Sequence, residues 1–461
     1  MYNRLQTIFC LNWLSNAAAG TPGSQSELQE FVTEVVNGTL NDPEAVKLIG
    51  SWEVTWGPVV YQHNEDGKFY NNVADNTLYV AKQVAAGLTT LTVAVAGTNP
   101  VSWYGWFVED FDVRPSVAWS DALQGNFQGK QTSDRSAPRI SQGTATGIDI
   151  LLNKMPDTTS GALLDYLKTE VAAATPGTLE VVVTGHSLGG ALSATLALYL
   201  AELQGRGGEC GWDPSRKAIV SCLPSAGATP GNAQFAQHFD QVIGTRTNRV
   251  WNFLDVVPHA WELDMLNQAA HLYFPYITPN DLVMALVDVA TANAVASEQD
   301  YLQINHQTPG LAGQVNLTET VEKIVPANIA IDALANLIAG TLAKKLGWSN
   351  AVKKGVTLII EAMLKKMLEN GDTPVVSDPV SNRPHPFARL KAALAAAEKT
   401  VISVADTVVD SKIVSQLPGL LIFVGQLGYQ HVAAYLQLMQ VTDFTARMAA
   451  VKANPPTPRL A

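Results

Sequence analysis

The residues most suited to chemistry lie around Ser187. The stretch Gly185-His186-Ser187-Leu188-Gly189 follows the pattern G-x-S-x-G, with an apolar run at 179–184 before it and small residues after it. This order predicts a buried strand, a tight turn and a helix, which together expose a serine hydroxyl at the carboxyl end of the strand. Glycine is needed two positions before and after the serine because a larger side chain would collide with neighbouring backbone. We therefore predict that Ser187 is a nucleophile. The alternative is a tight glycine turn whose serine has no catalytic role.

A serine hydroxyl is a poor nucleophile at neutral pH. It needs a histidine to take its proton, and that histidine needs an orienting carboxylate. After a turn of this kind the chain order is serine, acid, histidine. Asp255 follows the apolar run 250–254 and is the predicted acid, with Asp264 as the fallback. The alternative role for Asp255 is to cap a loop before a proline turn.

His431 is the predicted base because it follows the apolar run 420–424, the last predicted strand. Among the other histidines that follow the acid, His259 is too close to it to come from a separate loop, and His385 falls in a proline-rich segment. His271 is the main rival. The interval between acid and base is long, which implies that an insertion lies between them.

Short apolar runs alternate with helical patterns along most of the chain. Such runs are typical of strands buried on both faces, and their alternation with helices predicts an α/β fold with a mostly parallel central sheet. The predicted strands are residues 52–61, 78–84, 91–96, 179–184, 218–222, 249–254 and 420–424, and the main predicted helices are 28–36, 140–152, 163–174 and 191–204.

Residues 281–415 break this alternation, because apolar residues recur there at helical spacing, as at Leu334, Ile338, Leu342 and Leu346. We predict an N-terminal helical lead-in at 1–50, a core formed by 51–280 and 416–461, and a large helical insertion at 281–415 before the last core strand. The insertion is a candidate cap or lid. Its apolar stripes would equally serve to pack it on the core.

Several segments together resemble the class 3 lipases, the family that includes the fungal triacylglycerol lipases. The resemblance implies an α/β-hydrolase fold, a triad of Ser187, Asp255 and His431, and hydrolysis of acylglycerol esters through an acyl-enzyme. It also makes Thr98 the second oxyanion donor beside the N–H of Leu188; the alternative is that Thr98 only ends a strand. The segments are TVAVAGT at 92–98, residues 103–112, TGHSLGG at 184–190, GATPGNAQF at 227–235, RVWNFLDVVP at 249–258, and Gly428-Tyr429-Gln430-His431 with Tyr435.

The composition limits the kinds of partner that the protein is expected to bind. The net charge of −11 argues against nucleic acid, whose binding needs Lys and Arg at phosphates. Only 15% of residues are charged, which favours an apolar partner such as a lipid ester or a lipid–water interface, or else an alanine-rich protein with a quiet surface. No cluster has metal-ligand spacing, so neither metal nor cofactor is expected. Three cysteines are too few for a disulfide framework.

The chain has no apolar run long enough for a transmembrane helix, and its first residues make a poor signal peptide. The sequence therefore leaves two compartments possible: the cytoplasm, or the outside of the cell after secretion by a non-standard route. Two other functions also stay open: a phospholipase or acyltransferase that uses the same site, and a non-catalytic lipid-binding protein on a hydrolase fold. Covalent labelling of Ser187 distinguishes the last from the others.

Overall fold

The computed structural model describes residues 1–63, 73–97, 113–157, 161–208, 211–317 and 411–454, with a few isolated residues between 335 and 361. Thr98, and most of the insertion predicted at 281–415, lie outside the described residues.

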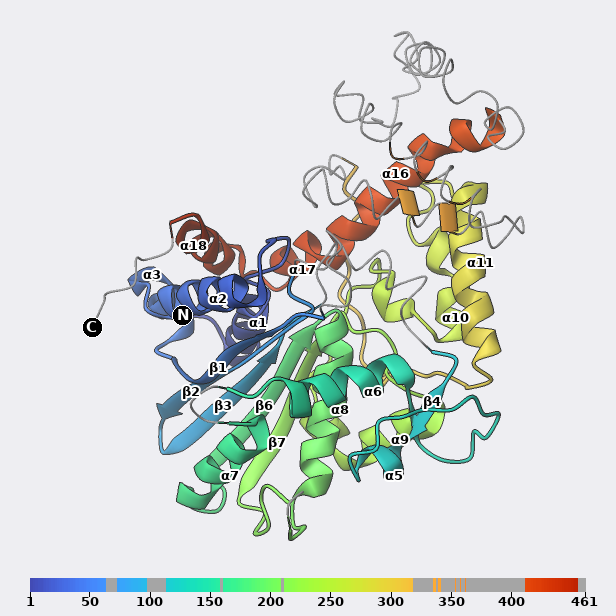
Figure 1. Ribbon diagram of the computed structural model, residues 1–461. Coiled ribbons are helices and arrows are strands. Elements are labelled where there is room, and N and C mark those ends of the chain that lie inside the picture. The colour runs from blue at the N-terminus through green and yellow to red at the C-terminus, as the bar shows by residue number, and fades with distance from the viewer. Residues whose placement is uncertain are drawn as a thin grey trace.

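A five-stranded sheet forms the centre of the molecule, in the order β1-β2-β3-β6-β7 (Figure 1). Strand β2 is antiparallel to β1 and β3, whereas β3, β6 and β7 pair in parallel, so four strands share one direction. The predicted mostly parallel sheet is thus confirmed. The strands are β1 (Glu53–Tyr61), β2 (Asn76–Ala85), β3 (Leu88–Val95), β6 (Leu179–His186) and β7 (Ala218–Ser225), with a small separate pair, β4 (Ser116–Ala118) and β5 (Arg139–Ser141).

Alternate residues of the central strands face two different helical layers. Val181 and Val183 of β6 join one core, and Val182 between them joins the other, because successive side chains of a strand point to opposite faces. The first layer contains α5 (Trp119–Ala122), α6 (Gln142–Asp149), a π-helix (Ile150–Lys154), α7 (Leu163–Ala173), α8 (Leu188–Leu203) and α9 (Ala233–Val242). The second contains α1 (Arg4–Leu14), α2 (Gln25–Leu40), α3 (Pro43–Ile49), α17 (Ala433–Leu438) and α18 (Thr442–Ala453).

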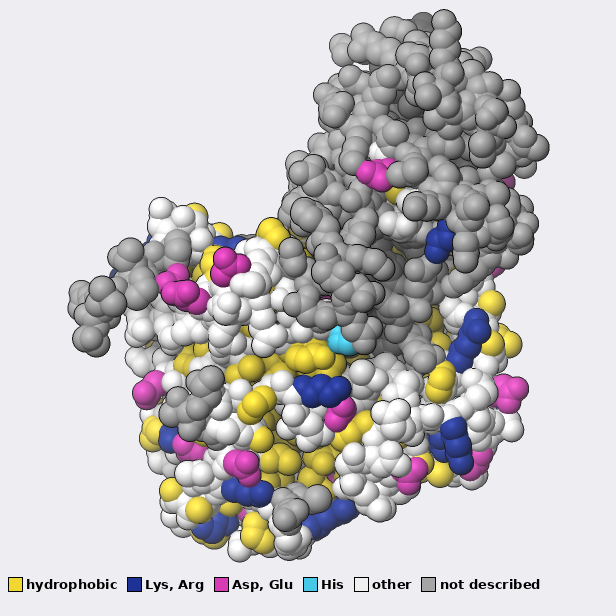
Figure 2. Space-filling model, in the orientation of Figure 1, with side chains coloured by type: hydrophobic (Ala, Val, Ile, Leu, Met, Phe, Trp, Pro, Cys, Tyr) yellow, Lys and Arg dark blue, Asp and Glu magenta, His cyan; other side chains and the backbone are white. Residues whose placement is uncertain are grey.

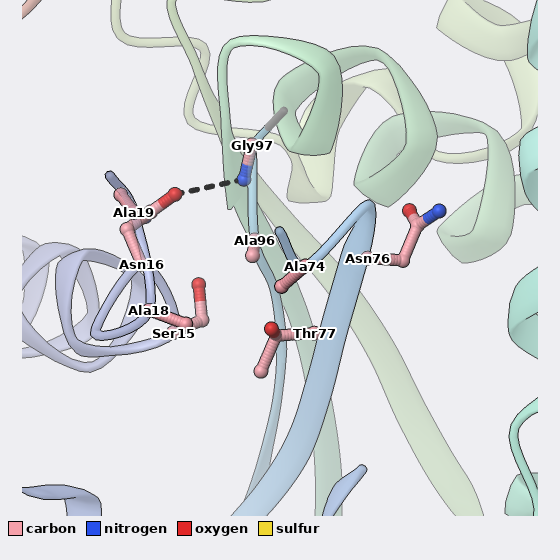
Figure 3. A pocket seen from close by; sticks show the side chains of 9 residues that line it. All are labelled: Ser15, Asn16, Ala18, Ala19, Ala74, Asn76, Thr77, Ala96 and Gly97. Atoms are coloured by element: carbon pink, nitrogen blue, oxygen red, sulfur yellow. Dashed lines mark hydrogen bonds between the residues drawn. The ribbon is translucent and has the colours of Figure 1, made fainter. Parts of the chain in front are cut away.

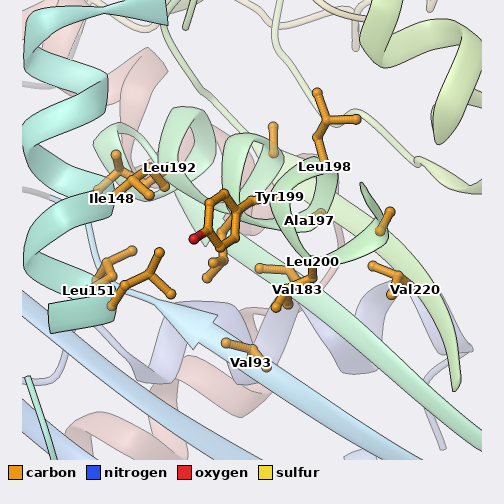
Figure 4. Close-up of a cluster of buried hydrophobic side chains, with 14 of the residues drawn as sticks. Val93, Ile148, Leu151, Val183, Leu192, Ala197, Leu198, Tyr199, Leu200 and Val220 are labelled. Atoms are coloured by element: carbon orange, nitrogen blue, oxygen red, sulfur yellow. The ribbon is translucent and has the colours of Figure 1, made fainter. Parts of the chain in front are cut away.

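Helix α8 is buried along almost its whole length, as expected of a helix that is apolar all round. Figure 4 shows Leu192 of this helix beside Ile148 of α6, and Leu200 near Val183 and Val220 of the sheet. The helix begins directly at the turn that carries Ser187, so its packing fixes the position of that turn.

A third cluster of helices and turns lies beyond the end of the sheet that carries the serine turn (Figure 1). It contains α10 (Leu263–Leu266), α11 (Asp281–Ala296), α16 (Ser411–His431) and the 3-10 turns Val257–His259 and Ala269–His271; another such turn, Gly244–Arg246, follows α9. None of the helices within the described ranges is both long and apolar enough to cross a bilayer.

Two predicted strands are wrong. Residues 249–254 are not a regular strand: around this segment the chain pairs with β7 at isolated parallel bridges, Thr247 with Cys222 and Val250 with Ser225. Pro224 near the end of β7 has no N–H to extend a ladder. Residues 420–424 lie inside helix α16, where the buried Leu420, Phe423, Val424 and Leu427 recur at helical spacing. A short apolar run does not separate strand from helix, and among the described residues no strand follows the insertion.

Candidate active site

The turn between β6 and α8 holds Ser187 in an unusual backbone conformation, with φ +62° and ψ −123°. The glycines around it are required by space. A Cβ on Gly185 would overlap the carbonyl of Gly189, and a Cβ on Gly190 would overlap the carbonyl oxygen of Ser225. The local sequence therefore dictates this turn, because only glycine lets the strand and the helix approach so closely.

Replacing Gly185 by alanine is expected to destabilise the protein by about 3 kcal/mol or more, because the new methyl group would overlap backbone that cannot move alone. The measurement is chemical denaturation of purified G185A followed by circular dichroism. The matched control is G207A, since a Cβ on Gly207 meets nothing within 4 Å. Equal stability of the two variants would contradict the tight turn.

Leu188 is the first residue of α8, so its N–H is one of the first four, which have no acceptor within the helix. This N–H therefore remains available to an oxyanion beside Ser187. The end of β3 lies next to the same turn: a Cβ on Gly97 would be only 3.1 Å from the Cβ of Ser187. The predicted second donor, Thr98, follows Gly97 but lies outside the described residues.

The turn at Gly97 is held by a residue that lies just after the first helix of the chain. The Gly97 N–H donates to Oδ1 of Asn16 at 2.9 Å. Figure 3 shows this bond at the edge of a small pocket between the residues after α1 and the ends of β2 and β3. The N-terminal region, predicted only as a lead-in, thus contacts the candidate site.

Asp255 and His431 are in direct contact. The Nδ1 atom of His431 lies 2.9 and 3.0 Å from the two carboxylate oxygens of Asp255, and both side chains are buried. Asp255 also accepts hydrogen bonds from the Tyr435 hydroxyl at 2.9 Å and from the Val257 N–H at 3.0 Å. The structure therefore brings together two residues that are 176 positions apart in the sequence.

The pair lies beside the serine turn. His186, the neighbour of Ser187, is 2.8 Å through Nε2 from the backbone oxygen of His431, and the two imidazole rings are 5.0 Å apart. Ser187 is itself buried, with 5% of its surface exposed. The Asp255–His431 pair thus lies against His186, the residue that precedes Ser187 at the carboxyl end of β6.

The rival residues lie elsewhere. Asp264 on α10 and His271 are exposed. His259 is buried, but its Nδ1 is 2.7 Å from the backbone oxygen of Asp255, not from the carboxylate. His385 lies outside the described residues.

Sequence reasoning missed four contributing residues. Tyr435 was visible as a residue four positions after His431, but its bond to the acid was not. His186 occupies a position that the G-x-S-x-G pattern leaves unspecified, so the pattern does not indicate a role for it. Asn12 and Asn16, on and just after α1, carry no motif at all.

Burial sets the protonation of the polar groups around the pair. It raises the pKa of Tyr435 well above its usual range, and the nearby Asp255 carboxylate raises it further, so the phenol stays protonated and donates. Burial also lowers the pKa of His186 well below its usual range, and the nearby His431 lowers it further. His186 is therefore neutral at physiological pH.

Replacing Tyr435 by phenylalanine is expected to lower kcat about tenfold, because a carboxylate loses one of its donors while the ring still fills its space. Steady-state hydrolysis of a soluble chromogenic ester would measure this. Y429F is the matched control, since the Tyr429 hydroxyl contacts Gln437 rather than the acid. A Y435F enzyme with unchanged kcat would show that the hydrogen bond from Tyr435 to Asp255 does not contribute to catalysis.

The sheet, the strained serine turn and its flanking helices define an α/β-hydrolase fold. The family model described as lipase (class 3) matches residues 117–265, the part of the chain that contains the serine turn and Asp255. The family match supports a lipase-type ester hydrolase.

Several solved structures are similar to the chain. M37 lipase is 25% identical, with a TM-score of 0.57 over 80% of this chain and 100% of its own. Lipase II from Rhizopus niveus is 16% identical, with a TM-score of 0.35 over 57% of this chain and 77% of its own. A triacylglycerol lipase from Penicillium expansum is 16% identical, with a TM-score of 0.30 over 56% and 73%. No curated protein matches the chain.

Proposed function

We propose that this protein hydrolyses acylglycerol esters through an acyl-enzyme formed on Ser187, with His431 as base and Asp255 as the orienting acid. The observation that carries the proposal is the buried Asp255–His431 pair beside the strained serine turn. A strained nucleophile, a histidine and a buried carboxylate in one place are the parts that acyl transfer needs.

The hydrogen bonds fix the direction of proton transfer. Because a carboxylate only accepts, Nδ1 of His431 carries the hydrogen that points to Asp255. In the neutral ring Nε2 is then the basic nitrogen. It takes the proton from Ser187 as the hydroxyl oxygen bonds to the ester carbonyl carbon, and returns it to the leaving alcohol oxygen as the C–O bond breaks.

The negative charge of the tetrahedral intermediate needs donors. The Leu188 N–H at the start of α8 supplies one, and we propose Thr98 for the second. Water then attacks the acyl-enzyme with His431 again as the base, which releases the carboxylic acid and restores Ser187. Each step moves one proton between oxygen and Nε2.

The preference for acylglycerols rests on the family and on the surface. On the face shown in Figure 2, Lys, Arg, Asp and Glu side chains are scattered among uncharged and hydrophobic ones. Such a surface gives little repulsion against an apolar ester or a lipid–water interface.

The test of the proposal is covalent labelling. Purified protein treated with a fluorophosphonate in mild detergent should carry one adduct, located on Ser187 by mass spectrometry, whereas heat-unfolded protein should carry none. An unlabelled Ser187 in folded protein would overturn the proposal and favour a lipid-binding role.

A substrate comparison then tests the ester class. Emulsified triacylglycerol should be cleaved faster than phosphatidylcholine vesicles at equal acyl concentration, with free fatty acid as the readout. Faster release from the phospholipid would replace the acylglycerol assignment with a phospholipase, and acyl transfer to an added alcohol would indicate an acyltransferase.

A further inference from the structure

The side chain of His186 connects the serine turn to the main chain at His431, 245 residues later. His186 ends β6, so its backbone position is set by the sheet. Its Nε2 lies 2.8 Å from the carbonyl oxygen of His431, and its Nδ1 lies 3.1 Å from the hydroxyl of Ser225. Both ring nitrogens therefore have partners, and neither partner belongs to the proposed triad's side chains.

The partners select one tautomer. A carbonyl oxygen only accepts, so Nε2 of His186 must carry the hydrogen. Because the ring is neutral, Nδ1 is an acceptor, and only the Ser225 hydroxyl is there to donate to it. Neutral His186 is thus a fixed donor to the main chain of the proposed base.

Helix α1 supports the other side of this arrangement. Asn12 donates through Nδ2 to the Ser225 oxygen at 2.9 Å, which leaves the Ser225 hydrogen directed either to His186 or to the Gly185 carbonyl at 3.1 Å. Asn12 and Ser225 are both fully buried. When the Ser225 hydrogen points to His186, the chain of hydrogen bonds runs from α1 through Ser225 and His186 to His431.

Aromatic rings hold His186 in place. Trp13 of α1 packs edge-on against its imidazole at 5.2 Å, Tyr435 does so at 5.1 Å and Phe9 at 6.5 Å. These contacts resist rotation of the ring, because each rotamer change would displace a packed aromatic side chain. The donor direction of Nε2 is therefore set by packing as well as by hydrogen bonding.

The carbonyl that receives this bond is one that needs a partner. His431 is the last residue of α16, and the last four carbonyls of a helix have no donor within it. The acid fixes the imidazole of His431 through Nδ1, whereas the bond from His186 fixes the backbone from which that imidazole extends.

We propose that His186, supported by Ser225 and Asn12, is a positioning residue that fixes the main chain of His431 and so aims its imidazole at Ser187. This inference rests on the proposed function. It assigns to the residue before the nucleophile, and to the first helix, a role in alignment rather than in proton transfer.

The test compares His186→Gln with His186→Met. Glutamine places an N–H close to the position of Nε2, whereas methionine has a similar length and no donor. With a soluble ester, H186M should lose kcat about tenfold or more with KM changed less than about twofold, because a misaligned base affects the chemical step. H186Q should recover to within about threefold of wild type, since the bond to the carbonyl returns.

Fluorophosphonate labelling gives a second readout that does not depend on substrate binding. The rate of adduct formation on Ser187 should fall in H186M and recover in H186Q, in parallel with kcat. Thermal unfolding of each variant must remain cooperative for the comparison to count. If H186M does not fold, Asn12→Ala tests the same chain of bonds, with an expected loss in kcat of about threefold.

A double variant sharpens the result. If Asn12 acts through His186, adding N12A to H186M should cause no further loss, since the chain of bonds is already broken. Full turnover in folded H186M, equal slowing in H186Q and H186M, or additive losses in the double variant would each overturn the inference. Absence of labelling in wild type would instead overturn the proposed function, so the two failures are distinguishable.

Discussion

The S187A variant is expected to hydrolyse esters about 10⁶-fold more slowly than wild type, which is the loss found when a serine nucleophile acting within a triad is removed. The whole proposed acyl transfer depends on one oxygen atom, the hydroxyl oxygen of Ser187. The measurement is initial-rate hydrolysis of a chromogenic ester at high enzyme concentration. Activity within about a hundredfold of wild type would place the nucleophile elsewhere.

The same position predicts an effect on stability. Ser187 has φ +62° and ψ −123°, a conformation that costs a residue with a Cβ of the order of 1 kcal/mol or more and costs glycine little. S187G should therefore unfold at a higher denaturant concentration than S187A, by about 1 kcal/mol in the free energy of unfolding. Equal midpoints for the two inactive variants would mean that the turn is not strained.

The D255N variant is expected to lose about 10⁴-fold in kcat while keeping its fold. An asparagine amide can direct its NH₂ group at Nδ1 of His431, which moves the imidazole hydrogen to Nε2. Nε2 then has no lone pair with which to accept the serine proton. Asp255 is completely buried and bonded to His431, Tyr435 and Val257, so no solvent molecule readily replaces its carboxylate.

The control for this variant is D264N. Asp264 was the fallback acid from the sequence, yet the structure places it on the exposed surface of α10. D264N should keep kcat within about twofold of wild type, as expected for an exposed substitution away from the chemistry. A large loss in D264N, with D255N active, would reverse the assignment of the acid.

The sequence predicted what is locally encoded. The serine turn was predictable because its glycines, the apolar run of β6 and the small residues of α8 are contiguous. Asp255 and His431 were predictable from their order along the chain, although the strands expected before them are an irregular segment and a helix. Their contact depends on how α16 packs against the rest of the protein, and this packing cannot be predicted from a short stretch of sequence.

The contacts of the first helix could not be predicted for a similar reason. Asn12 contacts Ser225, which is 213 residues away, and Asn16 contacts Gly97, which is 81 residues away. The Asn12 side chain is polar and buried, and the Asn16 side chain is polar and partly buried, whereas a helical pattern alone predicts that polar side chains are exposed. Only the packing of α1 across the sheet gives them a function.

The long interval between the two halves of the site also orders events during synthesis. His186 and its neighbour Ser187 are translated 245 and 244 positions ahead of His431. At about 5–20 residues per second, the growing chain carries the serine turn for roughly 10–50 s before its base exists. During that time the turn has neither its histidine nor the main-chain partner of His186. Under the proposed function, hydrolysis therefore begins only after the residues up to Tyr435 have been added and folded back onto the first helix.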